Sequence, residues 1–480
     1  MTRLSTCGVC SALTPVLTLV LTLVLTWSAS ASAQSLDLRI PRETLLGFQP
    51  GTAGQPVTGT LTLEEAIQRG LEYNLNVVDA RYTVASAEGQ RRVSRAALLP
   101  RVVADMQETW QTVNLQAFGF RFESPIAGFD FPSVVGPFPL FDLRARLSQT
   151  VFDRSAWNSH RAAGESVRAA EFSAQDARDI VVLAVGGSYL QALAARARVD
   201  SGRAQLETAN ALLKQAQQRR GVGLVAQVDV DRAEVQSLQQ QQRLIALQND
   251  FAKLKIDLAR LIGAQPTDQF SLTEDLPFVP APALDATTAL QQAREQRADL
   301  KASVTAVRAA ELDLSAAKSA YLPTVNVNAD YGTLGPNPNE ARRTFAVVGQ
   351  VRVPIWQGGR TEGQIDQAEA ALARRQAALD DLNRVVEGEI RKAMFDVEAF
   401  AAQVGVNERN LQVSRETLEL TRQRFEAGVS GNIEVVQAQD SVSVAAFDYI
   451  NSVFSHNVAK LNLARSLGNT EVRIREYLRR

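Results

Sequence analysis

Cysteine and histidine are the residues that this chain has least of, and their scarcity excludes several kinds of chemistry. The 480 residues include two cysteines, Cys7 and Cys10, and two histidines, His160 and His456. Both cysteines lie in an N-terminal segment that we expect to be cleaved, so the mature protein is predicted to have no disulfide, thiolate ligand or thiol nucleophile. The histidines lie in different halves of the chain, and solvated helix positions are a simpler interpretation than a shared metal or proton-relay site.

The common enzyme motifs are absent as well. The chain contains no HExxH zinc motif, no GxxxxGK[ST] phosphate loop and no GxSxG nucleophile turn. Its three methionines, one of them the initiator, are too few for a soft-metal pathway. We therefore expect no enzyme, no catalytic or cofactor-binding residue, no metal site and no cofactor.

Charge and hydropathy set two further limits. The formal net charge of −1 gives none of the excess positive charge that nucleic-acid binding requires. Beyond the N-terminus the chain has no unbroken apolar run of about 18 residues, so we expect no membrane-spanning helix. Entry into a bilayer would therefore require strands.

Residues 1–33 have the pattern of a secretory signal peptide. Arg3 provides a short basic start, residues 13–27 are mostly apolar, and Ala31-Ser32-Ala33 forms a small-residue exit. Cleavage there predicts an exported protein that begins with an irregular N-terminal arm over residues 34–60.

The strongest pattern in the chain is an internal duplication. Ala66 aligns with Ala289 at an offset of 223 positions, and Gly223 aligns with Gly428 at an offset of 205 positions. The alignment gives a first repeat over residues 61–265, a linker over 266–283, a second repeat over 284–468 and a C-terminal tail over 469–480. Each repeat is predicted to contain a helix, a strand pair and a long helical hairpin, an organisation that most enzyme folds lack.

Each repeat opens with a helix that carries its own start signal. Thr62 and Glu65 form a capping box, and Asp285 occupies the position of Thr62 in the second repeat. We expect each helix to run without a break to the Leu-Pro pairs that end at Pro100 and Pro323.

Past each proline the apolar period changes to two, which predicts strand pairs within residues 101–152 and 324–356. A water-soluble antiparallel sheet with one wet face would alternate in the same way. The signal peptide argues for a membrane sheet instead, and four strands are too few to close a barrel. We therefore expect several chains to contribute strands to one shared transmembrane barrel.

Two helix-compatible runs, at about residues 153–218 and 358–426, are each long enough to extend for roughly 100 Å. In the second run, apolar residues recur at every seventh position: Ile390, Val397, Val404, Leu411, Leu418 and Phe425. The first run has a matching apolar column with small residues beside it, among them Ala195, Gly202, Ala209 and Ala216. Both patterns predict left-handed coiled coils. A soluble coiled-coil rod would share these heptads, but it would not account for the strands.

Each long helix ends in a glycine-bearing break before a shorter return helix. The breaks cover residues 221–227 and 427–432. Glycine permits the positive φ angles that close a helical hairpin, and Asn432 can cap the second return helix.

The duplicated layout, the Leu-Pro helix-to-strand junctions and the tip over residues 220–230 resemble the TolC-type outer membrane efflux channel family. The resemblance implies a mainly α fold with a membrane β part, in which duplicated long helices form an α-barrel tunnel. Four strands per chain would contribute to a 12-stranded transmembrane β-barrel of a homotrimer. It also implies an outer membrane location in a Gram-negative-type cell, with a long periplasmic extension.

The same resemblance implies partners and site residues. The adaptor-docking tips would be Val222, Gly223, Leu224, Val225, Gly428, Val429, Ser430 and Gly431. They would dock onto a periplasmic adaptor (membrane fusion) protein that is coupled to an inner-membrane pump of the RND or ABC type.

Asp229 and Glu434 match the acidic positions of the family's periplasmic gate, with Phe425 and Gln437 beside them. Gln437 stands where a second carboxylate is common, and Phe425 and Ser430 replace a tyrosine and an arginine of the best-known latch. The two carboxylates could instead act only as partners of the helix dipoles, and that alternative stays open.

The predicted function is the exit duct of a tripartite efflux or type I secretion system. Such a duct would passively export drugs, small molecules or proteins that the pump hands over. The alternative is a soluble periplasmic coiled-coil scaffold or adaptor, although the lipoyl-like and β-barrel domains of adaptors are not evident. The Phe-, Pro- and Gly-rich segment from Phe118 to Phe141 is expected to form an external loop with aromatic side chains at the lipid interface.

Overall fold

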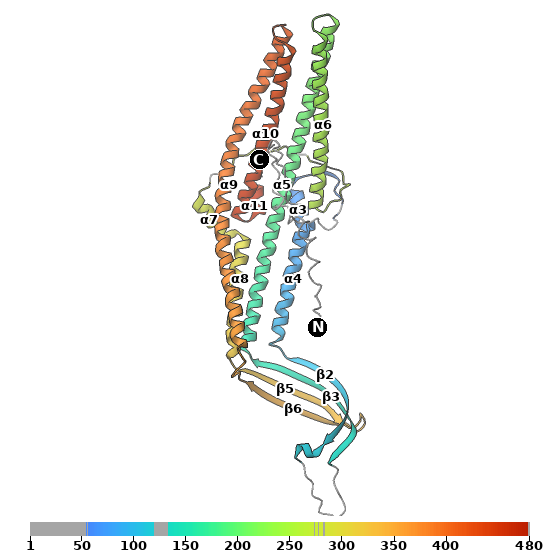
Figure 1. Cartoon of the computed structure of the whole chain (residues 1–480), viewed down its shortest axis with the longest axis vertical. Coiled ribbons are helices and arrows are strands. Elements are labelled where there is room, and N and C mark those ends of the chain that lie inside the picture. Colours follow the sequence, from blue (N-terminus) through green and yellow to red (C-terminus); the bar gives the residue numbers. More distant parts are fainter. Residues whose placement is uncertain are drawn as a thin grey trace, which may run out of the picture. The chain divides into compact units, whose positions relative to one another are not determined.

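The computed structural model describes residues 54, 56–119, 133–272, 274–276, 278–281 and 284–478, all within one compact unit, Leu46–Arg480. The expected signal peptide and most of the expected N-terminal arm lie outside the described residues. Within this unit, two helical hairpins extend toward one end and a β-sheet lies at the other end (Figure 1).

The same order of elements occurs twice. The first repeat contains α3 (Leu63–Tyr73), α4 (Leu75–Ala96), β2 (Arg101–Asn114), the 3-10 turn η1 (Leu115–Phe118), β3 (Val134–Phe152), α5 (Arg154–Gly221) and α6 (Gln227–Leu261). The second contains α7 (Ala286–Gln296), α8 (Ala298–Lys318), the 3-10 turn η2 (Ser319–Tyr321), β5 (Thr324–Gly335), β6 (Arg342–Arg352), α9 (Arg360–Glu426) and α10 (Asn432–Leu467). Helices α5 and α9 have 68 and 67 residues, so each extends for about 100 Å.

Both predicted helix starts are present. The Thr62 hydroxyl accepts a hydrogen bond from the Glu65 backbone N–H at 3.3 Å, and the Glu65 carboxylate accepts one from the Thr62 N–H at 3.0 Å. Asp285 caps α7 by accepting from the backbone N–H groups of Thr287 and Thr288. The start of each repeat is therefore encoded locally.

The opening helices are each interrupted by a buried polar residue, where the sequence predicted one continuous helix. Asn74 caps α4 by accepting from the Asn76 N–H at 3.0 Å, while its amide donates to the last carbonyl of α6 at 3.2 Å. Arg297 is 2% exposed and forms ion pairs with Asp299 and Glu389, each at 2.6 Å. Both residues adopt an extended backbone. One partner of each residue, Leu261 for Asn74 and Glu389 for Arg297, lies far along the chain, so apolar periodicity carries no sign of the breaks.

Three short elements lie in the segments that were predicted as the arm, the linker and the tail. β1 (Gly59–Leu61) lies at the end of the arm, and β4 (Phe270–Leu272) lies in the linker. The two strands pair in parallel, and Leu61, Phe270 and Leu272 are buried. The tail forms helix α11 (Thr470–Leu478), whose first N–H donates to the Asp179 carboxylate at 2.9 Å. These segments are too short to show a period, and only the core that covers them gives them structure.

The main hydrophobic core lies where α3, α5, α10 and α11 meet (Figure 1). Val181, Val185 and Tyr189 of α5 have no exposed surface, and the Tyr189 hydroxyl donates to the Leu61 carbonyl at 3.0 Å. One window of α5 is long and apolar enough to cross a membrane, although the sequence led us to expect no spanning helix. Because 67% of that window is buried inside the protein, its hydropathy is explained by core packing.

The predicted heptads are the buried stripes of the long helices. In α9, Ile390, Val404, Leu411 and Phe425 are 2, 0, 8 and 7% exposed, and Val397 and Leu418 pack against the same clusters. In α5, the small residues Ala195, Gly202, Ala209 and Ala216 are buried. A Cβ added at Gly202 would lie 3.0 Å from Leu247 of α6, so glycine there permits close helix packing.

The four long strands form one antiparallel sheet in the order β2-β3-β5-β6, so the hairpins of the two repeats join through β3 and β5. Two strand boundaries differ from those that the sequence pattern indicated. β3 begins at Val134, inside the segment expected to be an external loop, and β6 ends at Arg352, short of residue 356. β3 continues because it pairs with the far end of β2, although two prolines obscure its pattern. Residues 120–132 of the expected loop lie outside the described residues.

His456 was expected at a solvated helix position, and the structure places it in the interior instead. It is 0% exposed, its Nε2 lies 3.2 Å from the Val279 carbonyl oxygen, and its ring packs on Phe278. Lys460, one turn further along α10, is also fully buried and donates to the carbonyls of Val279 and Tyr477, both at 2.8 Å. Burial lowers the pKa of Lys460 to about 8 and moves the pKa of His456 below its ordinary value.

The pKa of Lys460 predicts a stability window. Between pH 8 and 10.5, the unfolded chain keeps a proton on Lys460 that the folded chain has released, so this residue makes stability rise with pH. Below pH 8 both states are protonated, and its contribution no longer changes. We expect the melting temperature of the wild type, measured by helical circular dichroism, to increase relative to Lys460→Met between these pH values. The prediction would be contradicted if the melting-temperature difference between the wild type and Lys460→Met were the same at pH 8 and at pH 10.5. It would also be contradicted if Lys253→Met, a change at an exposed site, gave the same pH-dependent difference.

Candidate functional site

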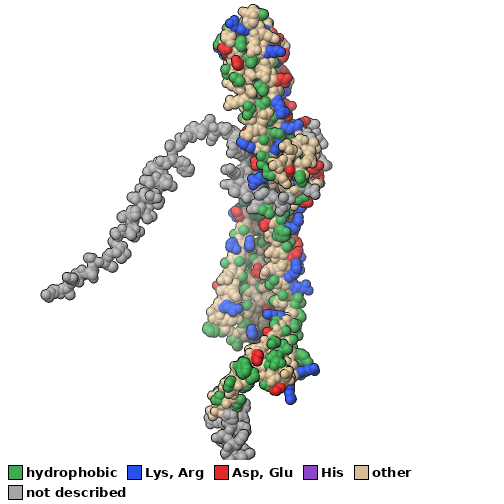
Figure 2. All heavy atoms as spheres, turned by 90° about the vertical axis from the view of Figure 1, so that its right-hand side faces the viewer, with side chains coloured by type: hydrophobic (Ala, Val, Ile, Leu, Met, Phe, Trp, Pro, Cys, Tyr) green, Lys and Arg blue, Asp and Glu red, His purple; other side chains and the backbone are tan. Residues whose placement is uncertain are grey.

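The sheet has one apolar face, and the register aligns it across all four strands. One row of paired residues contains Val102, Leu147, Ala329 and Val347, and the next row on the same face contains Ala104, Ala145, Tyr331 and Phe345. Phe345 and Val347 are 78% and 68% exposed. Hydrophobic side chains gather over the sheet in the lower part of Figure 2. A strand of a transmembrane barrel presents this kind of exposed apolar face to lipid.

The opposite face of the sheet carries ion pairs, both within a strand and between strands. Arg144 of β3 binds Asp142 at 2.6 Å and Asp330 of β5 at 3.3 Å, and Arg146 binds Asp105 of β2 at 2.8 Å. These side chains link three strands through charged groups that are well suited to water. The sheet can therefore separate an apolar medium from an aqueous one.

Both edges of the sheet are open. β2 and β6 each pair with a single strand in the part of the chain that the structure describes. An unpaired edge leaves backbone N–H and C=O groups without partners, which is costly in lipid because no water replaces them. A membrane function would therefore require strands from other chains.

The tips of the two helical hairpins repeat one turn geometry. Gly223 and Gly428 have φ angles of +78° and +76°, as glycine at a helix end permits. The N–H that follows each glycine bonds back across the last helical turn, from Leu224 to the Arg219 carbonyl at 2.9 Å and from Val429 to the Arg424 carbonyl at 3.0 Å. The predicted breaks are thus the same hairpin closure made twice.

The predicted docking residues cover these tips. Val222, Leu224 and Val429 are 72, 72 and 69% exposed, although they are apolar. The glycines of the tips are exposed as well, while Val225 and Ser430 are half-buried. Exposed apolar side chains at the ends of charged helices are typical of a surface that contacts another protein.

Arg219 of α5 connects the two hairpins just behind their tips. Its guanidinium donates to the carbonyls of Phe425 and Glu426 at 3.0 and 3.1 Å, and it lies 4.6 Å from the centre of the Phe425 ring. It therefore satisfies the free carbonyls at the C-terminus of α9 and also makes a cation–π contact. No sequence pattern predicted a role for Arg219. A basic residue in the last turn of a helix was the available signal, but its partner lies 206 positions away.

Asn432 forms a second connection, where the sequence predicted an N-cap of its own helix. Gly431 is the N-cap of α10, without a side-chain cap. The buried Asn432 amide donates to the Asp229 carbonyl of α6 at 2.9 Å, so the return helices of the two repeats meet here. An asparagine can either cap its own helix or bond to a neighbouring one. Here the presence of the Asp229 carbonyl on the other hairpin determines that it does the second.

The predicted gate residues fall into two groups. Phe425 is 7% exposed and packs against Leu212 and Val435, so within one chain it serves as an anchor between helices rather than as an exposed latch. Glu434 and Gln437 are exposed on the first turns of α10 and, three residues apart, lie on the same side of it.

Asp229, the remaining predicted gate residue, lies in the first turn of α6, 3.6 Å from Arg232. Its side chain is 26% exposed. Because its carbonyl binds Asn432, the acidic first turns of α6 and α10 adjoin each other. No group of three or more His, Cys, Asp or Glu residues suited to a metal ion occurs in the described part of the chain.

The sequence matches a known protein family, and the match follows the two repeats of this architecture. A family model described as "Outer membrane efflux protein" covers residues 66–264 and 289–469, more than half of the chain. The two segments begin at Ala66 and Ala289, the residues that the duplication pairs.

Three relatives illustrate the range of similarity. The chain is 25% identical to the outer membrane protein TolC of Vibrio cholerae, over 64% of this chain and 73% of that protein. It is 24% identical to the outer membrane protein OprJ of Pseudomonas aeruginosa, over 85% and 84% of the two chains. It is 25% identical to the alkaline protease secretion protein AprF of the same species, over 75% and 76%.

Solved structures share the fold. The Campylobacter jejuni CmeC outer membrane channel aligns with a TM-score of 0.73 at 16% identity, over 87% of this chain and 89% of that one. The open state of the Neisseria gonorrhoeae MtrE outer membrane channel aligns with a TM-score of 0.70 at 18% identity, over 88% and 94%. The predicted mainly helical fold with a small strand part is confirmed.

The Arg219 contact predicts how the tips respond to its loss. Arg219→Ala removes two hydrogen bonds from a charged donor, so we expect the hairpins to separate at the tips and to lose about 1–2 kcal/mol of local stability. Spin labels on Val222→Cys and Val429→Cys should report a longer and broader distance distribution in this variant. Arg220→Ala, at the adjacent exposed position, is the control. If both alanine variants kept the wild-type distribution, Arg219 would not hold the hairpins together.

Proposed function

Since the chain belongs to the outer membrane efflux protein family, we propose that it is the outer membrane exit channel of a tripartite exporter. The observation that carries the proposal is the register of the sheet, which places a continuous apolar face opposite a charged face. The first face suits lipid and the second suits a water-filled lumen. A soluble scaffold or adaptor is not favoured, because it would leave this apolar face in water.

The open edges of the sheet support a trimer. Strand β2 of one chain would pair with β6 of the next, and three chains would close a barrel of 12 strands without a free edge. Helices α4, α5, α8 and α9 contact one another in that order and continue from the strands (Figure 1). Three copies would extend the barrel as a ring of twelve helices, of which α5 and α9 are about 100 Å long and α4 and α8 about 30 Å.

The hairpin tips supply the contact with the other parts of the exporter. Their exposed apolar residues Val222, Leu224 and Val429 would dock onto the periplasmic adaptor, which connects the duct to an inner-membrane pump. The pump, of the RND or ABC type, would supply the energy. Asp229, Glu434 and Gln437 would line the periplasmic opening, and three copies of the two carboxylates would concentrate negative charge there. Phe425, packed against Leu212 and Val435, would hold together the helices that carry the gate.

The cargo class follows the partner pump. TolC and OprJ are named as outer membrane proteins, whereas AprF is named for alkaline protease secretion. A duct with a wide polar lumen suits small molecules and proteins alike, so we assign both efflux and type I secretion as candidate pathways for this chain.

Two adjacent valines of β6 test the membrane sheet. Val347 lies on the apolar face and Val348 on the charged face. An arginine in contact with lipid costs about 2–4 kcal/mol near the middle of a bilayer, whereas an arginine facing water does not. We expect Val347→Arg to reduce the yield of trimer in the outer membrane fraction, and Val348→Arg and the wild type to insert and give stepwise ion currents in planar bilayers. Equal yields of the two variants, or a wild type that remains a water-soluble monomer without current, would reject the proposal.

Two tip substitutions test docking. Leu224→Asp together with Val429→Asp places charges on the apolar tips, so we expect export to be lost in cells that carry the partner adaptor and pump. Trimer assembly and bilayer conductance should be unchanged, because the sheet lies at the other end of the helices. Val472→Asp, at an exposed apolar position on α11, is the matched control. Normal drug resistance or protein secretion in the double variant would contradict a docking role.

A further inference from the structure

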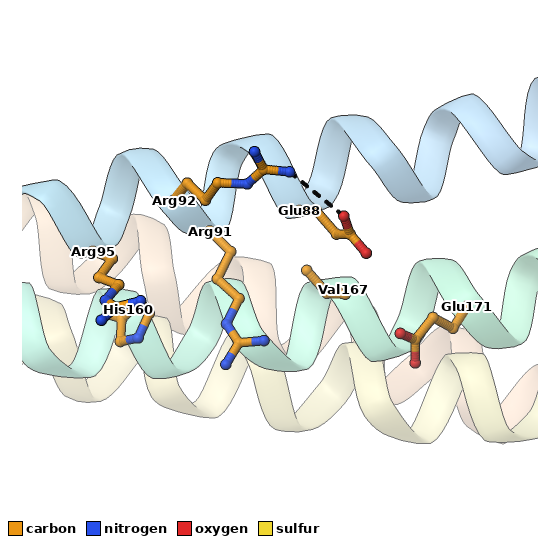
Figure 3. Close-up of a pocket in the computed structure, with 7 residues that line it drawn as sticks. All are labelled: Glu88, Arg91, Arg92, Arg95, His160, Val167 and Glu171. Atoms are coloured by element: carbon orange, nitrogen blue, oxygen red, sulfur yellow. Dashed lines mark ion pairs between the residues drawn. The ribbon is translucent and has the colours of Figure 1, made fainter.

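A groove of about 450 Å³ lies between α4 and α5 near the sheet (Figure 3). Its lining is mostly charged and consists of Glu88, Arg91, Arg92, Arg95, His160, Val167 and Glu171. The docking tips and the gate lie at the other ends of the long helices. The groove therefore requires an explanation of its own.

Helical spacing brings the basic side chains together. Glu88, Arg91 and Arg95 are three and four residues apart and so share one face of α4. His160 lies on the facing side of α5, and Gly164 follows it one turn later. The Nε of Arg91 lies 3.9 Å from where a Cβ on Gly164 would be, so the absence of a side chain there lets Arg91 reach across onto α5.

The positive charge of the groove is only partly neutralised. Arg92 pairs with Glu88 at 3.7 Å. Arg91 and Arg95 have no ion pair among the described residues, and the enclosed Nδ1 of His160 has no hydrogen-bond partner there. Figure 3 shows Arg95 beside His160 at one end and Glu171 at the other end. The charge is therefore polarised along the groove, with its basic end toward the sheet.

The basic end is also close to the expected membrane surface. Arg95 lies in the last turn of α4, directly before β2, and His160 lies about 10 Å from the start of α5, directly after β3. Trp157, one turn nearer the sheet on the same side of α5, is 51% exposed. Tryptophan is enriched at membrane interfaces, where one part of its ring contacts acyl chains and the N–H contacts water.

We propose that this groove binds a phosphate ester, and that its source is a phospholipid headgroup of the periplasmic leaflet. The guanidinium groups of Arg91 and Arg95 present paired donors that match phosphate oxygens, and His160 adds a further donor or acceptor. Trp157 would contact the glycerol region above the phosphate. Glu171 confines the anion to the half of the groove nearest the sheet. The lipid source rests on the proposed membrane function, whereas the phosphate chemistry does not.

Native mass spectrometry of the full detergent-solubilised protein tests the proposal. Phosphatidylglycerol is titrated against diacylglycerol, which lacks the phosphate, and inorganic phosphate is added as a competitor. We expect phosphatidylglycerol to be retained over diacylglycerol and to be displaced by inorganic phosphate. The double variant Arg91→Gln/Arg95→Gln should bind phosphatidylglycerol about 10- to 100-fold more weakly, because charge-assisted hydrogen bonds are lost. Arg81→Gln, the same change on α4 outside the groove, should bind as the wild type does.

Equal binding by the double variant and the wild type would overturn the site, and so would an equal loss in Arg81→Gln. If inorganic phosphate displaced phosphatidylglycerol from the double variant as readily as from the wild type, the site would also be overturned. Selective binding of inorganic phosphate without any competition from phosphatidylglycerol would overturn the lipid source. The measurement needs no conductance, so a chain that conducts without binding lipid contradicts this inference alone. A chain that binds lipid without conducting contradicts the proposed function alone.

Discussion

A backbone N–H or C=O group in the hydrocarbon part of a membrane has no water to bond with, and this constraint governs the organisation of the chain. The sheet has four long strands, and β2 and β6 are left as edges within the described chain. In lipid those edges must be paired, so a single chain cannot be the working unit of a membrane sheet. The same sheet connects to α4, α5, α8 and α9. A closed ring of strands would therefore impose a closed ring of helices next to it, on the side where the chain continues from the strands.

The helical part is held together by a few specific contacts at widely separated levels. A core around Tyr189 packs the two repeats against each other in the middle, and the buried Arg297, at the junction of α7 and α8, forms ion pairs with Asp299 of α8 and Glu389 of α9. At the far end, Arg219 and Asn432 connect the hairpins through backbone carbonyls. Between these levels the hairpins rely on thin coiled-coil seams. This distribution suits a molecule whose ends must engage different surroundings while the middle stays fixed.

A second stripe on α9 is an observation in favour of the proposed trimer that does not depend on the strands. Val406, Val413 and Leu420 recur every seven residues and are 69, 43 and 61% exposed. The buried column of the same helix already packs within the chain, so the second column has no partner among the described residues. A neighbouring chain in the proposed trimer would cover it by the same coiled-coil packing that holds the first column.

The sequence by itself determined the features that depend on short-range rules: the duplication, the capped helix starts at Thr62 and Asp285, the heptads, the glycine turns and the period of the strands. These could be predicted because a cap, a positive φ angle or a repeat period is decided by residues within a few positions of one another. Only the tertiary structure decided where Asn74 and Arg297 break the helices, that Lys460 and His456 are buried, and that Arg219 connects tips 206 positions apart. It also decided the register that aligns the apolar rows of four strands. Each of these depends on partners brought together by folding, and neither composition nor periodicity contains the identity of such a partner.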